Sequence, residues 1–119
     1  MNQDDKTIII DSNNMQWEEQ KSAKTGLSSY KKIFHIDPKT GMRIHLHRYP
    51  AGFMTPWHKH NCSHGMYVLE GTLYTDKGCL GPGGFVWFPE GVLAEHGATE
   101  EGDVTVFFIT DKTFDIQFV

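Results

Sequence analysis

The sequence predicts an all-β fold in which short antiparallel strands form one small barrel. Segments with alternating or β-branched apolar residues recur at near-regular spacing, and turn residues separate them. No segment carries the capped apolar stripe of an amphipathic helix. At 119 residues, 39% of them apolar, the chain has the size and composition of a single domain with its own core.

The first half of the chain contains a short apolar run and then a predicted hairpin. Residues 7–11 are largely β-branched, and we expect an edge strand or an arm that reaches another subunit. Residues 15–24 have no apolar stripe, so we expect irregular structure there. A strand over residues 30–36 and a returning strand over 42–49 flank a turn at 37–41, where Pro38 and Gly41 occupy typical turn positions.

The second half is predicted to supply the remaining strands, separated by glycine-containing turns. We expect strands over residues 53–60, 66–69, 72–75, 85–88, 104–110 and 114–119. The set amounts to about nine or ten strands and no helix, which favours a small antiparallel barrel. We therefore expect residues 1–28 to form an N-terminal arm or edge strand and residues 29–119 to form the barrel.

Charge and composition argue against several classes of partner. The net charge is −4 and the sequence pI is about 5.9, which disfavours nucleic acid and anionic membrane surfaces. No apolar run approaches the roughly 18 residues of a membrane span. The start, MNQDDKTIII, lacks the features of a secretory signal, and the chain has only two cysteines, so we expect a cytoplasmic protein without disulfides.

A group of four histidines is the main functional signal. His58, His60 and His64 fall within the segment WHKHNCSH, and His96 follows a glycine- and proline-rich segment at residues 81–91. Alternate side chains of a strand point to one face, so His58 and His60 should project together. Imidazole is a common ligand of transition metals, and we expect these four side chains to converge on one ion. The alternative is a set of surface or hydrogen-bonded histidines, which suits one isolated histidine better than a cluster.

These residues also resemble the two signatures of the cupin barrels. Gly52, His58, His60, His64 and Gly71 follow the spacing of the first signature, Gly-x5-His-x-His-x3-4-Glu-x6-Gly. The segment from Gly83 through Pro89-Glu90-Gly91 to a later histidine resembles the second. The resemblance covers roughly residues 43–110, and it implies a double-stranded β-helix, or jelly roll, with its metal-binding core in that range. The HIDPKTG and YPAG segments further resemble the small cupins related to the carboxy-terminal domain of ChrR-type anti-sigma factors.

Two departures from the cupin pattern concern the expected metal ligands. His64 stands where the family usually has Glu, and it could be a ligand or a pocket residue; its spacing favours a ligand. Ala94 stands where the second signature usually has His, and His96 follows two residues later. A shift of two residues preserves the facing of a strand side chain, so His96 can still be a ligand if a small bulge absorbs the offset.

An all-histidine site would keep the full charge of a divalent ion, because imidazole is neutral. Such a site suits iron, nickel, copper or zinc, with manganese also possible, and it attracts anionic or chelating oxygen ligands. The resemblance implies an iron-dependent dioxygenase acting on a small organic substrate with keto, enol or thiol groups. The alternatives are a non-catalytic metal-binding or small-molecule-binding module and a metal-dependent isomerase or lyase. A homodimer formed by strand exchange is also expected.

Several other side chains are predicted to be structural. His45 and His47 alternate in RIHLHRY and share a face with Arg43 and Tyr49, so a solvated strand face is favoured over a role in orienting a ligand histidine. Cys62 is expected on a loop without metal contact. We expect the barrel core to contain large aromatic residues, namely Phe53, Trp57, Phe85, Trp87 and Phe107.

Overall fold

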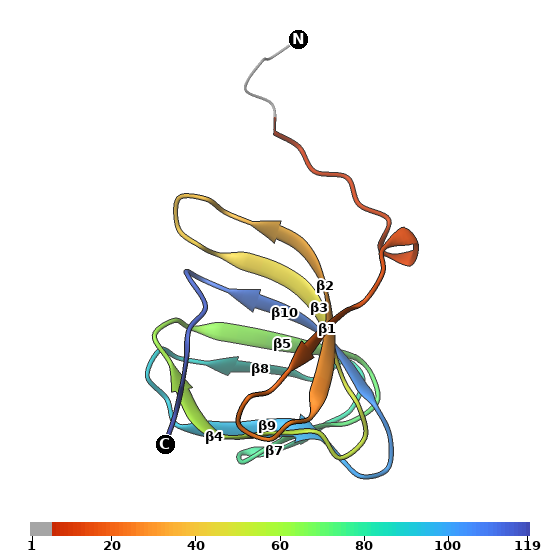
Figure 1. Ribbon diagram of the computed structural model, residues 1–119, viewed down its shortest axis with the longest axis vertical. Coiled ribbons are helices and arrows are strands. Elements are labelled where there is room, and N and C mark those ends of the chain that lie inside the picture. Colours follow the sequence, from red (N-terminus) through yellow and green to blue (C-terminus); the bar gives the residue numbers. More distant parts are fainter. Residues whose placement is uncertain (1–5) are drawn as a thin grey trace.

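The computed structural model describes residues 6–119, which form two antiparallel sheets that face each other (Figure 1). A short 3-10 turn, η1 (Ser12–Asn14), precedes eleven strands within these residues. The strands are β1 (Glu18–Lys21), β2 (Ser28–Ile36), β3 (Arg43–Tyr49), β4 (Met54–His60), β5 (His64–Glu70), β6 (Leu73–Thr75), β7 (Gly78–Leu80), β8 (Phe85–Phe88), β9 (Ala94–Ala98), β10 (Val104–Thr110) and β11 (Ile116–Phe118).

The strand order of the two sheets brings distant parts of the chain together. The six-stranded sheet has the order β1-β2-β3-β10-β5-β8, and the five-stranded sheet has the order β11-β4-β9-β6-β7. All pairings are antiparallel. β10 lies between β3 and β5, so a strand near the end of the chain completes the wall that carries the first hairpin. This arrangement confirms the all-β fold predicted from the sequence, with the double-stranded β-helix form of the jelly roll.

Most strands lie close to their predicted positions. The strands at residues 85–88 and 104–110 have the predicted bounds, and those predicted at 30–36, 42–49 and 53–60 differ at an end by one or two residues. Two predictions were incomplete. The region 15–24, expected to be irregular, contains β1, whose four residues are all exposed at a sheet edge. The short strands β7 and β9 were missed, because Gly78 and Gly97 and the polar residues around them weaken the strand pattern.

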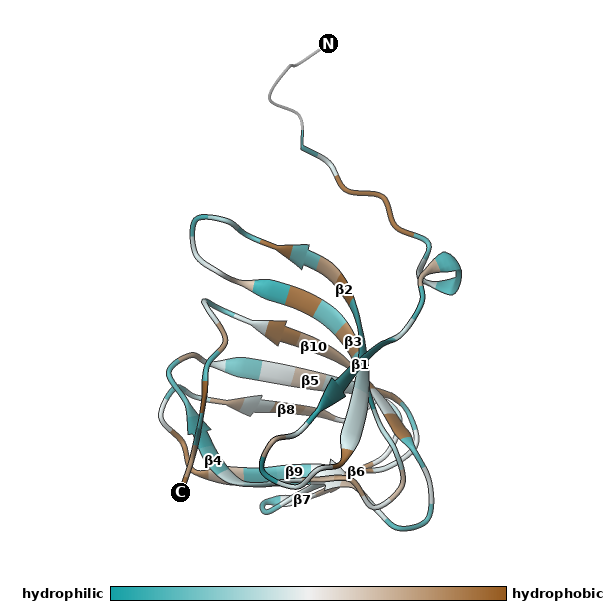
Figure 2. Cartoon of the chain, viewed as in Figure 1, coloured by the Kyte–Doolittle hydropathy of each residue, from teal (hydrophilic) through white to brown (hydrophobic). Residues whose placement is uncertain are grey.

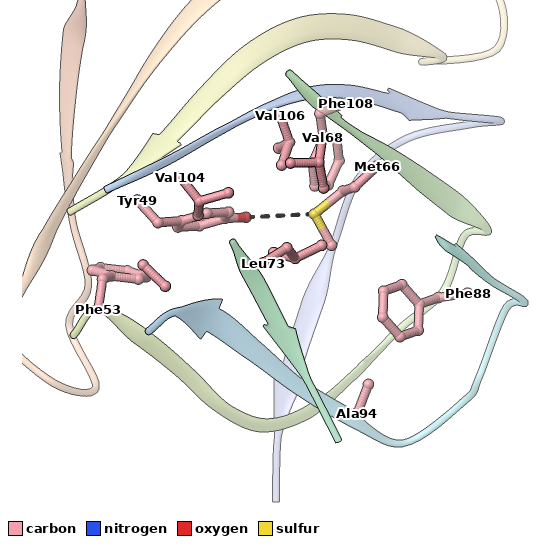
Figure 3. Close-up of a cluster of buried hydrophobic side chains, with 11 residues drawn as sticks. Tyr49, Phe53, Met66, Val68, Leu73, Phe88, Ala94, Val104, Val106 and Phe108 are labelled. Atoms are coloured by element: carbon pink, nitrogen blue, oxygen red, sulfur yellow. Dashed lines mark hydrogen bonds between the residues drawn. The ribbon is translucent and has the colours of Figure 1, made fainter. Parts of the chain in front are cut away.

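Apolar side chains fill part of the space between the sheets (Figure 3). Met66, Val68, Leu73, Val104 and Val106 have no exposed surface. Burial of apolar surface of this kind is the main force that holds two sheets face to face. The one polar contact drawn in this cluster joins the Tyr49 hydroxyl, as donor, to the Met66 sulfur at 4.0 Å.

The prediction of an aromatic core was wrong for three of its five residues. Phe53 is buried, and Phe107 is partly buried. Trp57, Phe85 and Trp87 are instead exposed by 42%, 55% and 47%. Phe85 and Trp87 alternate on β8, an edge strand, and both contact the position of Gly65 on the outer face of the neighbouring β5. Alternation places them on one face, and that face is the outer one.

Residues 7–11 do not form a strand with the rest of the chain. They run in an extended conformation toward the N-terminus (Figure 1), Ile8 and Ile10 border a pocket that Phe34 of β2 also lines, and Figure 2 shows an apolar segment along this arm. Ile9 is 93% exposed. An exchange of this segment with a second subunit stays a prediction. Within residues 6–119, no helix has the length and apolar character needed to cross a membrane.

Candidate metal centre

A β-bulge in β4 directs His58 and His60 to the interior. The pairing with β9 runs from Thr55 opposite His96 to His58 opposite Ala94, which is three steps on β4 against two on β9. The extra residue changes the alternation, so Thr55 and His58 can both face inward. His60 then follows on the same side, and both imidazoles are buried, with 1% and 6% exposure.

His96 reaches the same place from the neighbouring strand. It lies in the middle of β9, between β4 and β6, and its side chain is 4% exposed. The sequence predicted that a bulge would absorb the two-residue offset of this histidine. The structure does contain a bulge, but it lies in β4 rather than in the segment that precedes His96.

Three histidines form the group that could hold an ion. Ligand nitrogens of His58, His60 and His96 all lie within 4.8 Å of one another. Within residues 6–119, no other group of three or more His, Cys, Asp or Glu side chains brings its ligand atoms this close together. Small side-chain movements would bring the three nitrogens onto one ion at about 2.0–2.1 Å each, which is the usual zinc–nitrogen distance.

Hydrogen bonds to backbone carbonyls orient two of these rings. His58 Nδ1 lies 2.7 Å from the carbonyl oxygen of Pro56, and His60 Nδ1 lies 2.5 Å from that of Asp115. A carbonyl oxygen can only accept, so each Nδ1 must carry the proton and each Nε2 must keep its lone pair. The Nε2 of His58 is buried without a hydrogen-bond partner. This is the arrangement expected of a metal ligand.

Burial also keeps the cluster uncharged. It lowers the pKa of His60 to about 4, lowers the pKa of His58 and places the pKa of His96 well below its usual value, with repulsion between the rings adding to the effect for His60 and His96. Neutral imidazole is the form that binds metals. The site is therefore ready to accept a cation near neutral pH without first losing protons.

His64 lies beside this group but does not join it as closely. Its ring centroid is 4.6 Å from that of His60 and 6.2 Å from that of His96. The ring stacks between Phe88 and Phe108, and both its nitrogens are buried without hydrogen-bond partners. Burial lowers the pKa of His64 to about 3. Its role as a fourth ligand stays a prediction.

The prediction that His45 and His47 lie on a solvated face was wrong. They are 3% and 7% exposed and point into the space between the sheets. His45 Nε2 lies 3.2 Å from His47 Nδ1, and His47 Nε2 lies 2.8 Å from the Ser29 hydroxyl. Their spacing is the same as that of His58 and His60, and this signal could have identified a second inward pair. The sequence alone could not show which face of β3 is buried.

A cavity of about 260 Å³ connects both histidine groups. His58, His60 and His96 lie on the wall formed by β4 and β9, and His45 and His47 lie on the facing β3. The rest of the lining is mainly apolar and includes the aromatic residues Tyr49, Phe53, Phe108, Phe114 and Phe118. His64 does not line the cavity. A mostly apolar cavity with a few convergent polar groups is typical of a small-molecule site.

Neither cysteine belongs to the metal-binding group. Cys62 is fully buried, and burial raises the pKa of its thiol, so it is neither a thiolate nor an accessible redox group at neutral pH. Cys79 is exposed on β7. Both are free thiols.

Similar solved structures share the fold of this chain. A protein proposed to be an acetylacetone dioxygenase, from Methylibium petroleiphilum, is 15% identical with a TM-score of 0.80, and the match covers 100% of this chain and 85% of that one. An RmlC-like cupin from Ralstonia eutropha is 24% identical with a TM-score of 0.72, covering 87% and 68%. The anti-sigma factor ChrR of Rhodobacter sphaeroides, solved with SigE, is 18% identical with a TM-score of 0.67, covering 82% and 50%.

Sequence comparison identifies the family directly. No curated protein matches the chain. The profile of the ChrR cupin-like domain matches residues 5–114, which include every strand from β1 to β10 and all four histidines of the predicted site. This protein therefore belongs to the ChrR cupin-like domain family.

Proposed function

We propose that this protein is a metal-dependent dioxygenase, with iron as the favoured metal, that acts on a small organic molecule with keto, enol or thiol groups. The observation that carries the proposal is the convergence of three neutral histidines on the wall of a mostly apolar cavity. Three protein ligands leave coordination positions free for other molecules, which distinguishes catalytic from closed structural metal sites.

The side chains present fit a transition metal better than magnesium or calcium. His58, His60 and His96 offer nitrogen, and no carboxylate lies in the group. A divalent ion bound there would supply a Lewis acid for a carbonyl or enolate oxygen and, as iron, a redox centre. The carbonyls of Pro56 and Asp115 hold the ligand rings in place, and Phe108 and Phe114 help to exclude water from the cavity.

A non-catalytic metal-binding module is the second candidate. It is favoured by the structural likeness to ChrR, which is an anti-sigma factor. In that case the histidines would stabilise the barrel or sense a ligand, and oxygen would not be consumed. A metal-dependent isomerase or lyase would use the same Lewis acid without oxygen.

The test uses the full chain purified without a metal-affinity tag. We expect elemental analysis to find a transition metal near one equivalent, and the iron(II)-loaded protein to consume oxygen when pentane-2,4-dione is added. His58→Ala should lose both metal and oxygen uptake. His35→Ala is the matched control, because His35 lies on the outer side of β2, away from this cavity, and should retain both.

The outcomes separate the candidates. Retained zinc with no oxygen uptake for any keto, enol or thiol compound would favour the binding module or an isomerase. Protein that holds no metal after loading would contradict both the dioxygenase and the isomerase.

A further inference from the structure

The charged side chains at the cavity are all of one sign. Lys21, Lys31 and Arg43 line it, and no Asp or Glu side chain among residues 6–119 does so. The whole chain has the opposite balance, with 15 acidic and 11 basic residues. A cavity lined only by cations and neutral groups attracts anions, and its low-dielectric walls strengthen that attraction.

The cations lie on the wall that faces the metal ligands. Arg43, His45, His47 and Tyr49 alternate on β3 and all line the cavity. Lys31 lies directly opposite His47 in the β2–β3 pairing, and paired residues of neighbouring strands project to the same face. His58, His60 and His96 project from β4 and β9 in the other sheet. A ligand in the cavity can therefore contact the metal at one end and a cation at the other.

Arg43 and Lys31 form no ion pair with an acidic side chain in the part of the chain that the structure describes. The three side-chain ion pairs found within residues 6–119 use Arg48, Lys77 and Lys112. Arg43 and Lys31 are both partly buried, and their positive charges reach the interior, where they help to depress the pKa of His45 and His47. Cations that are partly desolvated and lack an acidic partner are well placed to bind an anionic ligand.

Most of the surface that lines the cavity is apolar. Phe108, Phe114 and Ile116 belong to this apolar lining, so a ligand that fills the cavity should have an apolar body. The guanidinium group binds carboxylates through two parallel hydrogen bonds, a geometry that lysine does not offer.

We propose that the cavity binds a small organic acid, with its keto or enol oxygens toward His58, His60 and His96 and its carboxylate held by Arg43 with the help of Lys31. The metal end of this proposal rests on the proposed function. The carboxylate end rests on the cations of β2 and β3 alone, so the two can be tested separately.

The test compares two probes of the same shape. The compound 4,6-dioxoheptanoate carries a diketone at one end and a carboxylate at the other, and 4,6-dioxoheptanamide replaces that carboxylate with a neutral amide. Calorimetric titration into metal-free and metal-loaded protein should show that the acid binds at least about tenfold more tightly than the amide in both forms, because hydrogen bonds between charged groups are strong. Elemental analysis of each preparation reports its metal content.

Arg43→Gln should remove most of this preference while leaving the affinity for the amide unchanged. Arg48→Gln is the matched control, since Arg48 lies on the same strand but faces outward, where it pairs with Asp103 at 3.0 Å. It should keep the full preference for the acid. Thermal unfolding of both variants shows whether each is folded.

Equal affinity for acid and amide, or no binding of either probe, would overturn the proposal. The same holds if Arg43→Gln keeps the preference of the parent. If the preference persists in protein that cannot be loaded with metal, the carboxylate site stands and the proposed dioxygenase function fails. If metal binds and the acid is not preferred, the metal site stands and this inference fails.

Discussion

The space between the two sheets has an apolar end and a histidine end, and both are buried. At the apolar end, Met66, Val68 and Leu73 pack with no exposed surface (Figure 3). At the histidine end, six imidazoles are each less than 10% exposed, namely His45, His47, His58, His60, His64 and His96. Apolar burial stabilises the fold directly, whereas buried polar atoms without partners cost stability.

The difference between the two ends suggests a division of roles. Five imidazole nitrogens at the histidine end are buried without a hydrogen-bond partner, and they belong to His45, His58, His64 and His96. A folded protein tolerates such groups where they serve a ligand. We therefore expect the apolar end to supply the stability and the histidine end to supply binding. The following predictions test that division.

A fall in pH should lower the free energy of unfolding more than any of the substitutions below. It should act through the buried imidazoles of the histidine end. The folded pKa is about 2 for His45 and about 3 for His47 and His64, below the usual 6.5 of the unfolded chain. Below pH 6.5 the unfolded state binds more protons, so stability is lost as the pH falls toward 3. Each group contributes about 1.4 kcal/mol per pH unit in this window.

Three such groups can remove the whole stability of an ordinary domain, about 5–15 kcal/mol, before pH 3 is reached. Urea unfolding of metal-free protein between pH 7.5 and 4.5 measures the effect. A free energy of unfolding that stays constant over this range would contradict neutral burial of these histidines.

Truncation should affect the stability of the two ends differently. Leu73→Ala removes a fully buried side chain and leaves a cavity, so we expect a loss of about 2–5 kcal/mol. His58→Ala in metal-free protein should cost less, because it also removes a buried nitrogen that has no partner. Urea unfolding of both metal-free variants checks this. An equal loss for the two would show that the histidine end contributes to stability as the apolar end does.

The Ser29 hydroxyl should contribute more to the free energy of unfolding than the hydroxyl of the adjacent Ser28. Ser29→Ala removes the partner of His47 Nε2 and should cost about 1–3 kcal/mol, since a buried polar group is left unpaired. Ser28→Ala is the control, because Ser28 is bonded to Glu19 at the exposed edge and its loss should fall within about 0.5 kcal/mol. Thermal unfolding of the two variants gives the comparison. Equal values would mean that solvent replaces the Ser29 hydroxyl.

Substitution of His64 should change metal affinity, and this is the smallest effect that we predict for the histidine end. If it is the fourth ligand, His64→Ala should weaken metal binding by about tenfold or more. His64→Glu should lower the charge of the site, weaken the binding of anionic ligands and favour harder metals such as manganese. Metal content after dialysis against a mild chelator measures the first effect. Retention like that of the parent, with loss in His96→Ala, would make His64 a packing residue between Phe88 and Phe108.

Much of the fold and part of the site could be predicted from local patterns. Alternation and turn residues located β3, β4, β8 and β10 within a residue or two, because strands and tight turns depend on nearby sequence. The one-residue gap between His58 and His60 predicted two rings on one face. Their proximity to His96 followed from the cupin-like spacing rather than from any local pattern.

Other features depended on how the sheets close. Alternation with a period of two shows which residues share a face, but it does not show which face lies inside. That ambiguity explains why His45 and His47 were expected in solvent and Trp57, Phe85 and Trp87 in the core, while the structure has the reverse. The bulge that turns His58 inward and the cations opposite the metal ligands likewise arise from pairing between distant strands. The sequence by itself determined most of the strands and the residue pairs that project together, and only the packing of the two sheets decided which pairs are enclosed.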